Sequence, residues 1–157
     1  GVRDACGPDL ALGVRLSADR FGILTEEMVE VAEQLVDTGE VDLLDMSLWD
    51  VRREATDGPL AGRRLVDLFA GIERGGVRLA VAGQLRRPSD VREGLGVDVA
   101  VLGRAAILQH DFPRRLAADP AFAPRSAPAS SGVLAEEGVS PAFLGYLKER
   151  FADLVAR

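Results

Sequence analysis

Short apolar runs alternate with amphipathic segments along most of this chain. Val, Leu and Ala dominate four such runs, residues 10–16, 41–46, 77–82 and 97–102. Apolar runs of this length are typical of strands that are buried on both faces of a parallel sheet. The first run is entered through Gly7-Pro8-Asp9, a turn signal. The pattern therefore predicts four buried strands.

Segments with helical spacing follow the predicted strands. Thr25 is placed to cap a helix that ends near Gly39 and points five side chains inward: Met28, Val31, Ala32, Leu35 and Val36. A second helix buries Leu65, Leu68, Phe69 and Ile72. Shorter helices are expected from Pro88 to Leu95, after Gly103, and over residues 111–118. Strands that alternate with helices predict an α/β fold, and the pattern alone leaves both a doubly wound sheet and a barrel open.

The C-terminal part of the chain changes in character. Residues 123–131 are rich in Pro, Ser and Ala, which is typical of a linker. A last helix is expected from Ser140-Pro141, with five inward side chains: Leu144, Leu147, Phe151, Leu154 and Val155. We therefore expect one domain, with an alternating core over residues 1–122 and a linker and helix over residues 123–157.

Composition and charge narrow the function classes. The 157 residues are 47% hydrophobic and carry a net charge of −6, which excludes disordered, collagen-like and disulfide-rich classes. An acidic chain lacks the overall positive charge of a nucleic-acid or anionic-membrane binder, so any anion site must be local. No apolar run is long enough for a membrane span, and a cytoplasmic location is expected. The single cysteine, Cys6, has no metal-ligand spacing and is interpreted as an inert thiol.

Two strand ends carry the strongest chemical signal. Gly83-Gln84 and Gly103-Arg104 each follow an apolar run directly, and backbone amides at such positions can bind a phosphate. Arg104 would add a charge-assisted contact. The alternative is that both glycines only permit tight turns and that Arg104 is solvated.

Other residues have both a chemical and a structural interpretation. Arg15 lies inside an apolar run, where burial without a partner would be costly, so it should meet an anion or pair with Asp45. Trp49 lies in a polar segment that either lines a pocket mouth or is solvated. His110, the only histidine, is expected on a surface loop, and a single histidine at this position assembles no nucleophile–base set.

Four segments, taken in order, resemble the Old Yellow Enzyme family of flavin oxidoreductases. They are GPDLALGVRLSAD, LTEEMVEVAEQLVDTGEVDLLDMSLWD, VRLAVAGQLRRPSDVREGL and VDVAVLGRAAILQHDFPRRL, and the tail VLAEEGVSPAFLGYLKERF is also similar to the family's C-terminal segment. The resemblance runs from about Gly7 to Leu116. It covers the second half of the family's (β/α)8 TIM barrel, so it implies a C-terminal half barrel of four parallel strand–helix units (strands five to eight) plus a helical tail.

The resemblance also implies a cofactor and roles for individual residues. FMN would be bound, with Arg15 against the flavin pyrimidine ring, the backbone of Gly83 and Gln84 on the phosphate, and Gly103 with Arg104 clamping that phosphate. NADH or NADPH would reduce FMN, which would then reduce an activated alkene. The substrate-binding residues and the tyrosine proton donor of the family would lie upstream of residue 1, and Tyr146 does not match that donor. This chain alone is therefore expected to be inactive.

Two other functions stay open at this point. Another phosphate-binding barrel enzyme uses similar strand-end glycines, although the only lysine, Lys148, lies in the tail, which argues against a Schiff-base enzyme. The other is a stand-alone half barrel that binds or assembles without catalysis. Four barrel strands leave two open edges, so we expect a partner, which is either the missing N-terminal half barrel or a second copy in a homo-oligomer.

Overall fold

The fold is described from a computed structural model that covers residues 1–18, 22–92 and 96–156. Its centre is one parallel sheet of four strands in the order β1-β2-β3-β4, which confirms the α/β prediction. The strands are β1 (Gly13–Ser17), β2 (Leu43–Ser47), β3 (Arg78–Ala82) and β4 (Val99–Val101). Each strand lies within or next to its predicted run. Strand β1 begins three residues later than its run, and residues 10–12 lie outside the sheet.

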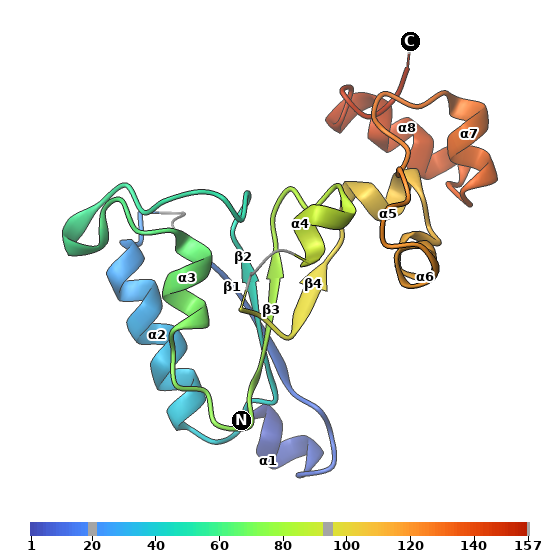
Figure 1. Ribbon diagram of the computed structural model, residues 1–157. Helices are drawn as coiled ribbons and strands as arrows, with labels where there is room; N and C mark the ends of the chain where they lie inside the picture. Colours follow the sequence, from blue (N-terminus) through green and yellow to red (C-terminus); the bar gives the residue numbers. More distant parts are fainter. Residues whose placement is uncertain (19–21, 93–95, 157) are drawn as a thin grey trace. The chain divides into compact units, whose positions relative to one another are not determined.

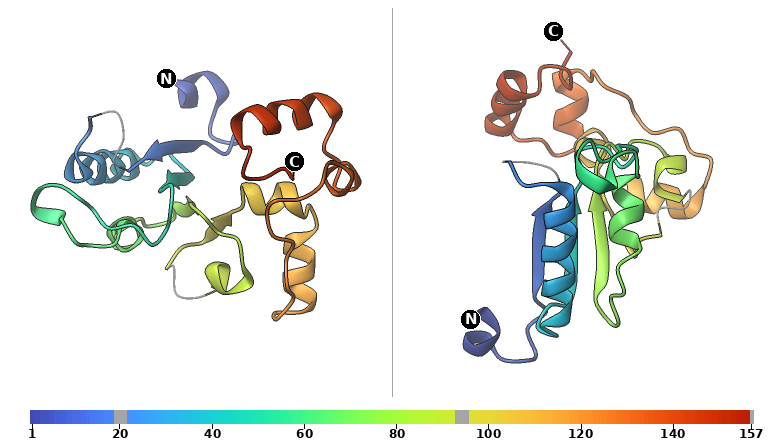
Figure 2. Two further views of the ribbon diagram at one scale, coloured as in Figure 1. Left: turned by 90° about the horizontal axis from the view of Figure 1, so that it is seen from above. Right: turned by 90° about the vertical axis from the view of Figure 1, so that its left-hand side faces the viewer.

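Helices fill the intervals between the strands (Figure 1). The first unit of the chain, Gly1–Gln84 with Gly94–Val101, contains α1 (Val2–Cys6), α2 (Thr25–Asp37), the short 3-10 helix η1 (Gly58–Leu60) and α3 (Leu65–Ala70). Figures 1 and 2 show α2 and α3 side by side along one face of the sheet. This arrangement follows from the pattern, because both helices are amphipathic and must bury one stripe.

Side chains alternate between the two faces of the sheet. Leu44 and Met46 of β2 and Leu79 and Val81 of β3 are fully buried on the face that α2 and α3 cover. The predicted inward side chains of α3 are all buried, whereas α2 buries Met28 and Ala32 and leaves Val31 38% exposed, so that prediction is wrong for Val31. The opposite face carries smaller and polar residues, among them Arg15, Asp45 and Ser47.

The second unit, Leu85–Glu93 with Leu102–Arg157, is helical. It contains α4 (Pro88–Arg92), α5 (Arg104–Leu108), α6 (Phe112–Ala118), α7 (Ser131–Glu136) and α8 (Pro141–Arg150). Leu95, the predicted end of the helix that begins at Pro88, lies outside the described residues. The core of this unit joins α5, α7, α8 and the chain end through Leu108, Ala129, Leu134, Leu147, Leu154 and Val155.

Residues 123–131, expected as a linker, contribute to this second core. Ala129 is 8% exposed, and its backbone forms an isolated parallel bridge with Val155: its N–H donates to Leu154 O at 2.9 Å and its C=O accepts from Ala156 N at 2.8 Å. Ser130 then caps α7, a helix that the composition of this segment had concealed. Ser140 caps α8 in the same way, at the position expected for it.

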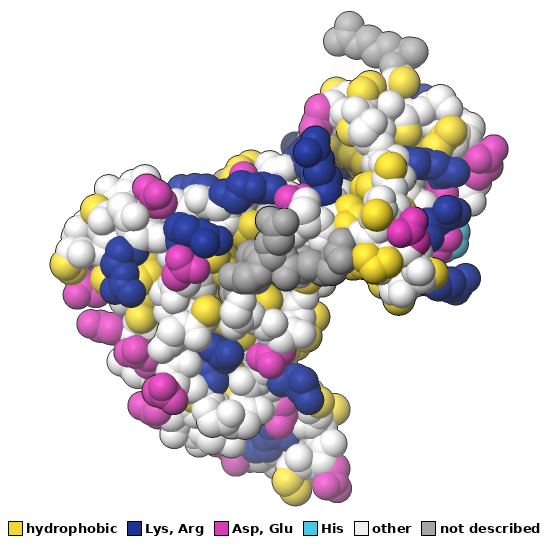
Figure 3. All heavy atoms as spheres, viewed as in Figure 1, with side chains coloured by type: hydrophobic (Ala, Val, Ile, Leu, Met, Phe, Trp, Pro, Cys, Tyr) yellow, Lys and Arg dark blue, Asp and Glu magenta, His cyan; other side chains and the backbone are white. Residues whose placement is uncertain are grey.

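No helix among the described residues is long and apolar enough to cross a membrane. Acidic and basic side chains are interspersed over the face drawn in Figure 3.

Candidate functional site

Arg15 lies in the middle of β1, opposite Asp45 of β2. Its Nε donates a hydrogen bond to Ser47 Oγ at 2.6 Å and lies 3.6 Å from Asp45 Oδ2. The pairing with Asp45 is confirmed. The expectation that Arg15 is buried is wrong, because its side chain is 63% exposed. The reason is the alternation of the strand, which places residue 15 on the sheet face that α2 and α3 do not cover.

One carboxylate oxygen of Asp45, the residue beside Arg15, accepts no hydrogen bond from the described residues. Asp45 Oδ1 is buried and has no hydrogen-bond partner among the described residues. A buried acceptor without a donor costs free energy, so such an atom marks a place where a donor is missing. Arg15 and Asp45 thus place one exposed guanidinium next to one buried carboxylate oxygen that accepts no hydrogen bond from the described residues.

Gly83 and Gln84 follow β3 directly, where the chain leaves the sheet. A Cβ on Gly83 would lie 2.9 Å from Val51 N and 3.0 Å from Asp50 N, so glycine is needed there to let the loop after β2 pass. Gln84 has a left-handed backbone, with φ of 54°, which is uncommon for a residue with a side chain. The amides of both residues donate to no acceptor in the described part of the chain. Close packing against the loop after β2 therefore accounts for glycine at position 83, and the Gly83 amide stays available to an anion.

Gly103 and Arg104 open α5 in the second unit. A Cβ on Gly103 would meet nothing within 4 Å, so packing within the described residues does not require glycine at this position. Arg104 is engaged: its Nη1 donates to Asp153 Oδ2 at 2.8 Å, and its guanidinium carbon lies 5.3 Å from the centre of the Phe151 ring. Arg104 is therefore not freely solvated, because its contacts with Asp153 and Phe151 of the C-terminal segment hold its guanidinium in place.

The other sequence candidates are distributed as follows. Trp49 is 59% exposed and has a left-handed backbone with φ of 62°, a strained geometry at the end of β2 that the sequence pattern did not indicate. His110 lies on the surface as predicted, with Nδ1 2.7 Å from Glu137 Oε2. Tyr146 and Lys148 lie on α8.

The five residues expected to contact a cofactor are divided between the two units. Arg15, Gly83 and Gln84 belong to the first unit, and Gly103 and Arg104 belong to the second.

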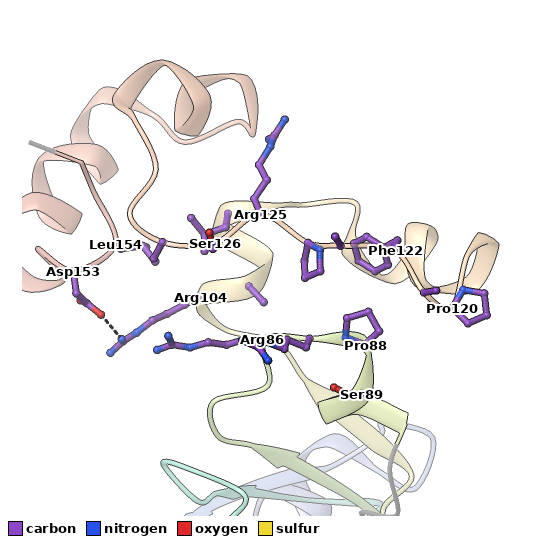
Figure 4. A pocket seen from close by; sticks show the side chains of 17 residues that line it. Arg86, Pro88, Ser89, Arg104, Pro120, Phe122, Arg125, Ser126, Asp153 and Leu154 are labelled. Carbon is purple, nitrogen blue, oxygen red and sulfur yellow. Dashed lines mark hydrogen bonds and ion pairs between the residues drawn. The ribbon is translucent and has the colours of Figure 1, made fainter.

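Sequence reasoning missed a pocket of about 640 Å³ in the second unit. Figure 4 shows Arg86 and Arg104 extended toward Asp153, with Phe122 and Pro88 at the other end of the pocket. The signal in the sequence is the doublet Arg86-Arg87, which stands directly before the helix predicted from Pro88.

Comparison with known proteins adds no assignment. No protein-family model matches this chain, and no curated protein matches it significantly.

Proposed function

We propose that this chain is the FMN-holding, C-terminal half of a (β/α)8 barrel in an NAD(P)H-dependent oxidoreductase of the Old Yellow Enzyme type. The observation that carries the proposal is the sequential, all-parallel sheet, which α2 and α3 cover on one face while Arg15 lies on the other. In a barrel, helices cover the outer face of the strands, and side chains on the inner face and at the carboxyl ends of the strands meet the ligand.

The pair of Arg15 and Asp45 suits the pyrimidine ring of a flavin. That ring has carbonyl and imine acceptors on one edge and an N–H donor next to them. The exposed guanidinium of Arg15 can donate to the acceptors, and the Asp45 carboxylate could accept the ring N–H once its rotation exposes the buried Oδ1. Ser47 holds the Arg15 Nε, which leaves the terminal nitrogens of Arg15 for the ligand. The positive charge of Arg15 would also stabilise negative charge that develops on this edge.

The strand-end glycines suit a phosphate. The amides of Gly83 and Gln84 have no acceptor among the described residues, and the space around Gly103 is open to a close approach. Arg104 can supply a charge-assisted hydrogen bond once its contact with Asp153 is exchanged. Both features favour FMN over riboflavin, which has the same ring without the phosphate.

When bound, FMN supplies hydride transfer between a nicotinamide cofactor and an activated alkene. The residues of this chain bind the phosphate, orient the ring and set its electrostatic environment. Side chains that polarise the alkene and donate a proton would be supplied by the N-terminal half barrel.

The test is a titration of this chain with FMN and with riboflavin, followed by quenching of flavin fluorescence. We expect FMN to bind at least about tenfold more tightly than riboflavin, because a hydrogen bond to a charged group is worth about 1.5–3 kcal/mol. Arg104→Ala should reduce this preference, and Arg114→Ala, which changes an exposed arginine of α6, should not. Equal affinity for the two flavins, or no binding of either, would refute the proposal.

A further inference from the structure

The pocket of the second unit is built by four segments of that unit. They are the Arg86–Ser89 stretch at the start of α4, α5, residues 120–127, and Asp153 with Leu154. Its volume of about 640 Å³ lies within the range of sites for small organic ligands, roughly 300–1,000 Å³. All four segments belong to one compact unit, so the pocket does not depend on the first unit.

The side chains that line this pocket carry a net positive charge, whereas the net charge of the chain is negative. Four arginines line it (Arg86, Arg87, Arg104 and Arg125), and Asp153 is the only acidic side chain among the lining residues. Asp153 pairs with Arg104, and Glu137, outside the lining, pairs with Arg125. The guanidinium groups of Arg86 and Arg87 have no acceptor among the described residues. Two uncompensated positive charges therefore remain in a protein whose net charge is −6.

The two free arginines are held at the pocket by their own backbone. The amides of Arg86 and Arg87 both donate to Asp90 Oδ2, each at 2.9 Å, which fixes the turn that precedes α4. Arg125 is placed similarly, since its amide donates to the buried Gln109 side chain at 3.2 Å. Because the backbone is fixed, less conformational entropy is lost when these side chains bind a ligand.

The rest of the pocket is apolar. Leu108 and Leu154 are buried beneath it, and Phe122 closes one side, where its ring packs edge-on against Phe112 at 5.1 Å between centroids. Pro88 and Ala105 add further apolar surface. A ligand that fits this surface has an apolar body, and the ring of Phe122 favours an aromatic one.

We propose that this pocket binds an aryl phosphate, that is, a small phosphate monoester with an aromatic body. A phosphate monoester carries a charge of about −1.5 to −2 at pH 7, which matches the two unpaired guanidinium groups. Each guanidinium can bind two phosphate oxygens in parallel. The aromatic body lies between Phe122 and the apolar side chains of α5. Arg104 lines this pocket and also belongs to the FMN phosphate contacts proposed above, whereas Arg86, Arg87 and Phe122 take no part in those contacts and are particular to this site.

Three probes separate the contributions of the phosphate and the ring. They are 1-naphthyl phosphate, 1-naphthol and inorganic phosphate, each titrated against the whole chain by calorimetry at one fixed ionic strength. We expect 1-naphthyl phosphate to bind at least about tenfold more tightly than either fragment, since the charged and apolar contacts act together. If it binds no more tightly than inorganic phosphate, the aromatic part of the proposal is wrong.

Variants then locate the binding. Arg86→Ala with Arg87→Ala should weaken 1-naphthyl phosphate at least about tenfold, while Arg86→Lys with Arg87→Lys keeps the charge and should retain part of the affinity. The matched control is Arg63→Ala with Arg64→Ala, an adjacent exposed pair in the first unit that produces the same change in net charge. Equal affinity of the alanine variant and the control would overturn the proposal.

The same variants separate this site from the flavin site. Arg15→Ala should leave the affinity for 1-naphthyl phosphate unchanged, and the Arg86/Arg87 alanine variant should leave the preference for FMN over riboflavin unchanged. If Arg15→Ala weakens 1-naphthyl phosphate as strongly as the Arg86/Arg87 variant does, the probe is bound at the flavin site and the second site does not exist. Thermal unfolding of each variant verifies that the second unit is intact.

Discussion

Two arginines supply the charged contacts proposed for the flavin, and each is held by a neighbouring acid. Arg15 contacts Ser47 and Asp45 across adjacent strands, and Arg104 contacts Asp153 and the Phe151 ring. The sequence indicated the first pairing, because strands that follow one another in a parallel sheet are usually neighbours. It gave no indication of the second, because residues 49 positions apart are joined only by the folding of the C-terminal segment.

In the proposed function, Asp153 would compete with the FMN phosphate for the Arg104 guanidinium. Asp153→Asn should therefore tighten FMN binding several-fold by removing this competitor, and it should lower the free energy of unfolding by no more than about 1 kcal/mol, the usual limit for an exposed ion pair. Fluorescence titration and urea unfolding measure the two effects. Glu149→Gln, a nearby exposed charge on α8, is the control. Weaker FMN binding by Asp153→Asn would mean that Asp153 positions Arg104 instead of competing for it.

Glu137 joins three parts of the second unit through a single buried carboxylate. Its side chain is 8% exposed, pairs with Arg125, and accepts from the His110 amide at 2.8 Å. Glu137→Gln leaves Arg125 without its ion-pair partner, and because Arg125 is 41% exposed we expect a loss of about 1 kcal/mol of unfolding free energy. Chemical denaturation measures this loss, and Glu136→Gln on the exposed side of α7 is the control. A loss equal to that of the control would contradict the bridging role.

At the level of elements, α1 is tied to the start of β2 through Asp42. The Leu12 amide donates to Asp42 Oδ2 at 2.7 Å, and Arg3 donates to the same oxygen at 2.7 Å. The amide of Leu12 first, and the guanidinium of Arg3 second, lower the pKa of the Asp42 carboxyl below its ordinary value of 3.8. Asp111 behaves similarly, since its hydrogen bond from Arg115 lowers the pKa of that carboxyl.

The lowered pKa values of Asp42 and Asp111 predict that acid lowers the stability of the protein. A carboxyl with a lowered pKa in the folded state contributes stability that is fully present above 3.8 and is lost as the pH falls through the lower, folded value. Asp42→Asn should therefore flatten the dependence of unfolding free energy on pH below about pH 4. Denaturant unfolding at a series of pH values measures this slope, and Asp37→Asn is the control on the exposed end of α2. Identical slopes for the two variants would contradict the assignment.

Most strands and helices of the first unit could be predicted from the hydrophobic pattern of the sequence. The four strands and α2 and α3 follow from apolar runs and from side chains at helical spacing, because burial in this unit is local and periodic. Val31 and Arg15 were misplaced because a pattern shows which residues are apolar and not which face a neighbour covers. Helix α7 was missed because Pro, Ser and Ala around residues 124–131 are typical of a linker, whereas pairing with the chain end gives this segment a core position.

The whole chain contains two compact units, each with its own apolar core. Leu134→Ala in the second core should cost about 2–5 kcal/mol in that unit. Hydrogen exchange then measures how the effect is distributed: amides of α7 and α8 should exchange faster, with much smaller changes in β2 and β3, because compact units open separately. Acceleration of equal size in both units would show that they unfold together.

The central claim is that strand-end amides of this chain hold the phosphate of FMN. The most direct measurement is a proton–nitrogen correlation spectrum of the chain, recorded as FMN and then riboflavin is added. The account predicts that the amide signals of Gly83, Gln84 and Gly103 shift with FMN and shift much less with riboflavin, since only FMN brings an acceptor to these donors. If these three signals respond equally to both flavins or to neither, the phosphate is not bound there and the flavin assignment is wrong.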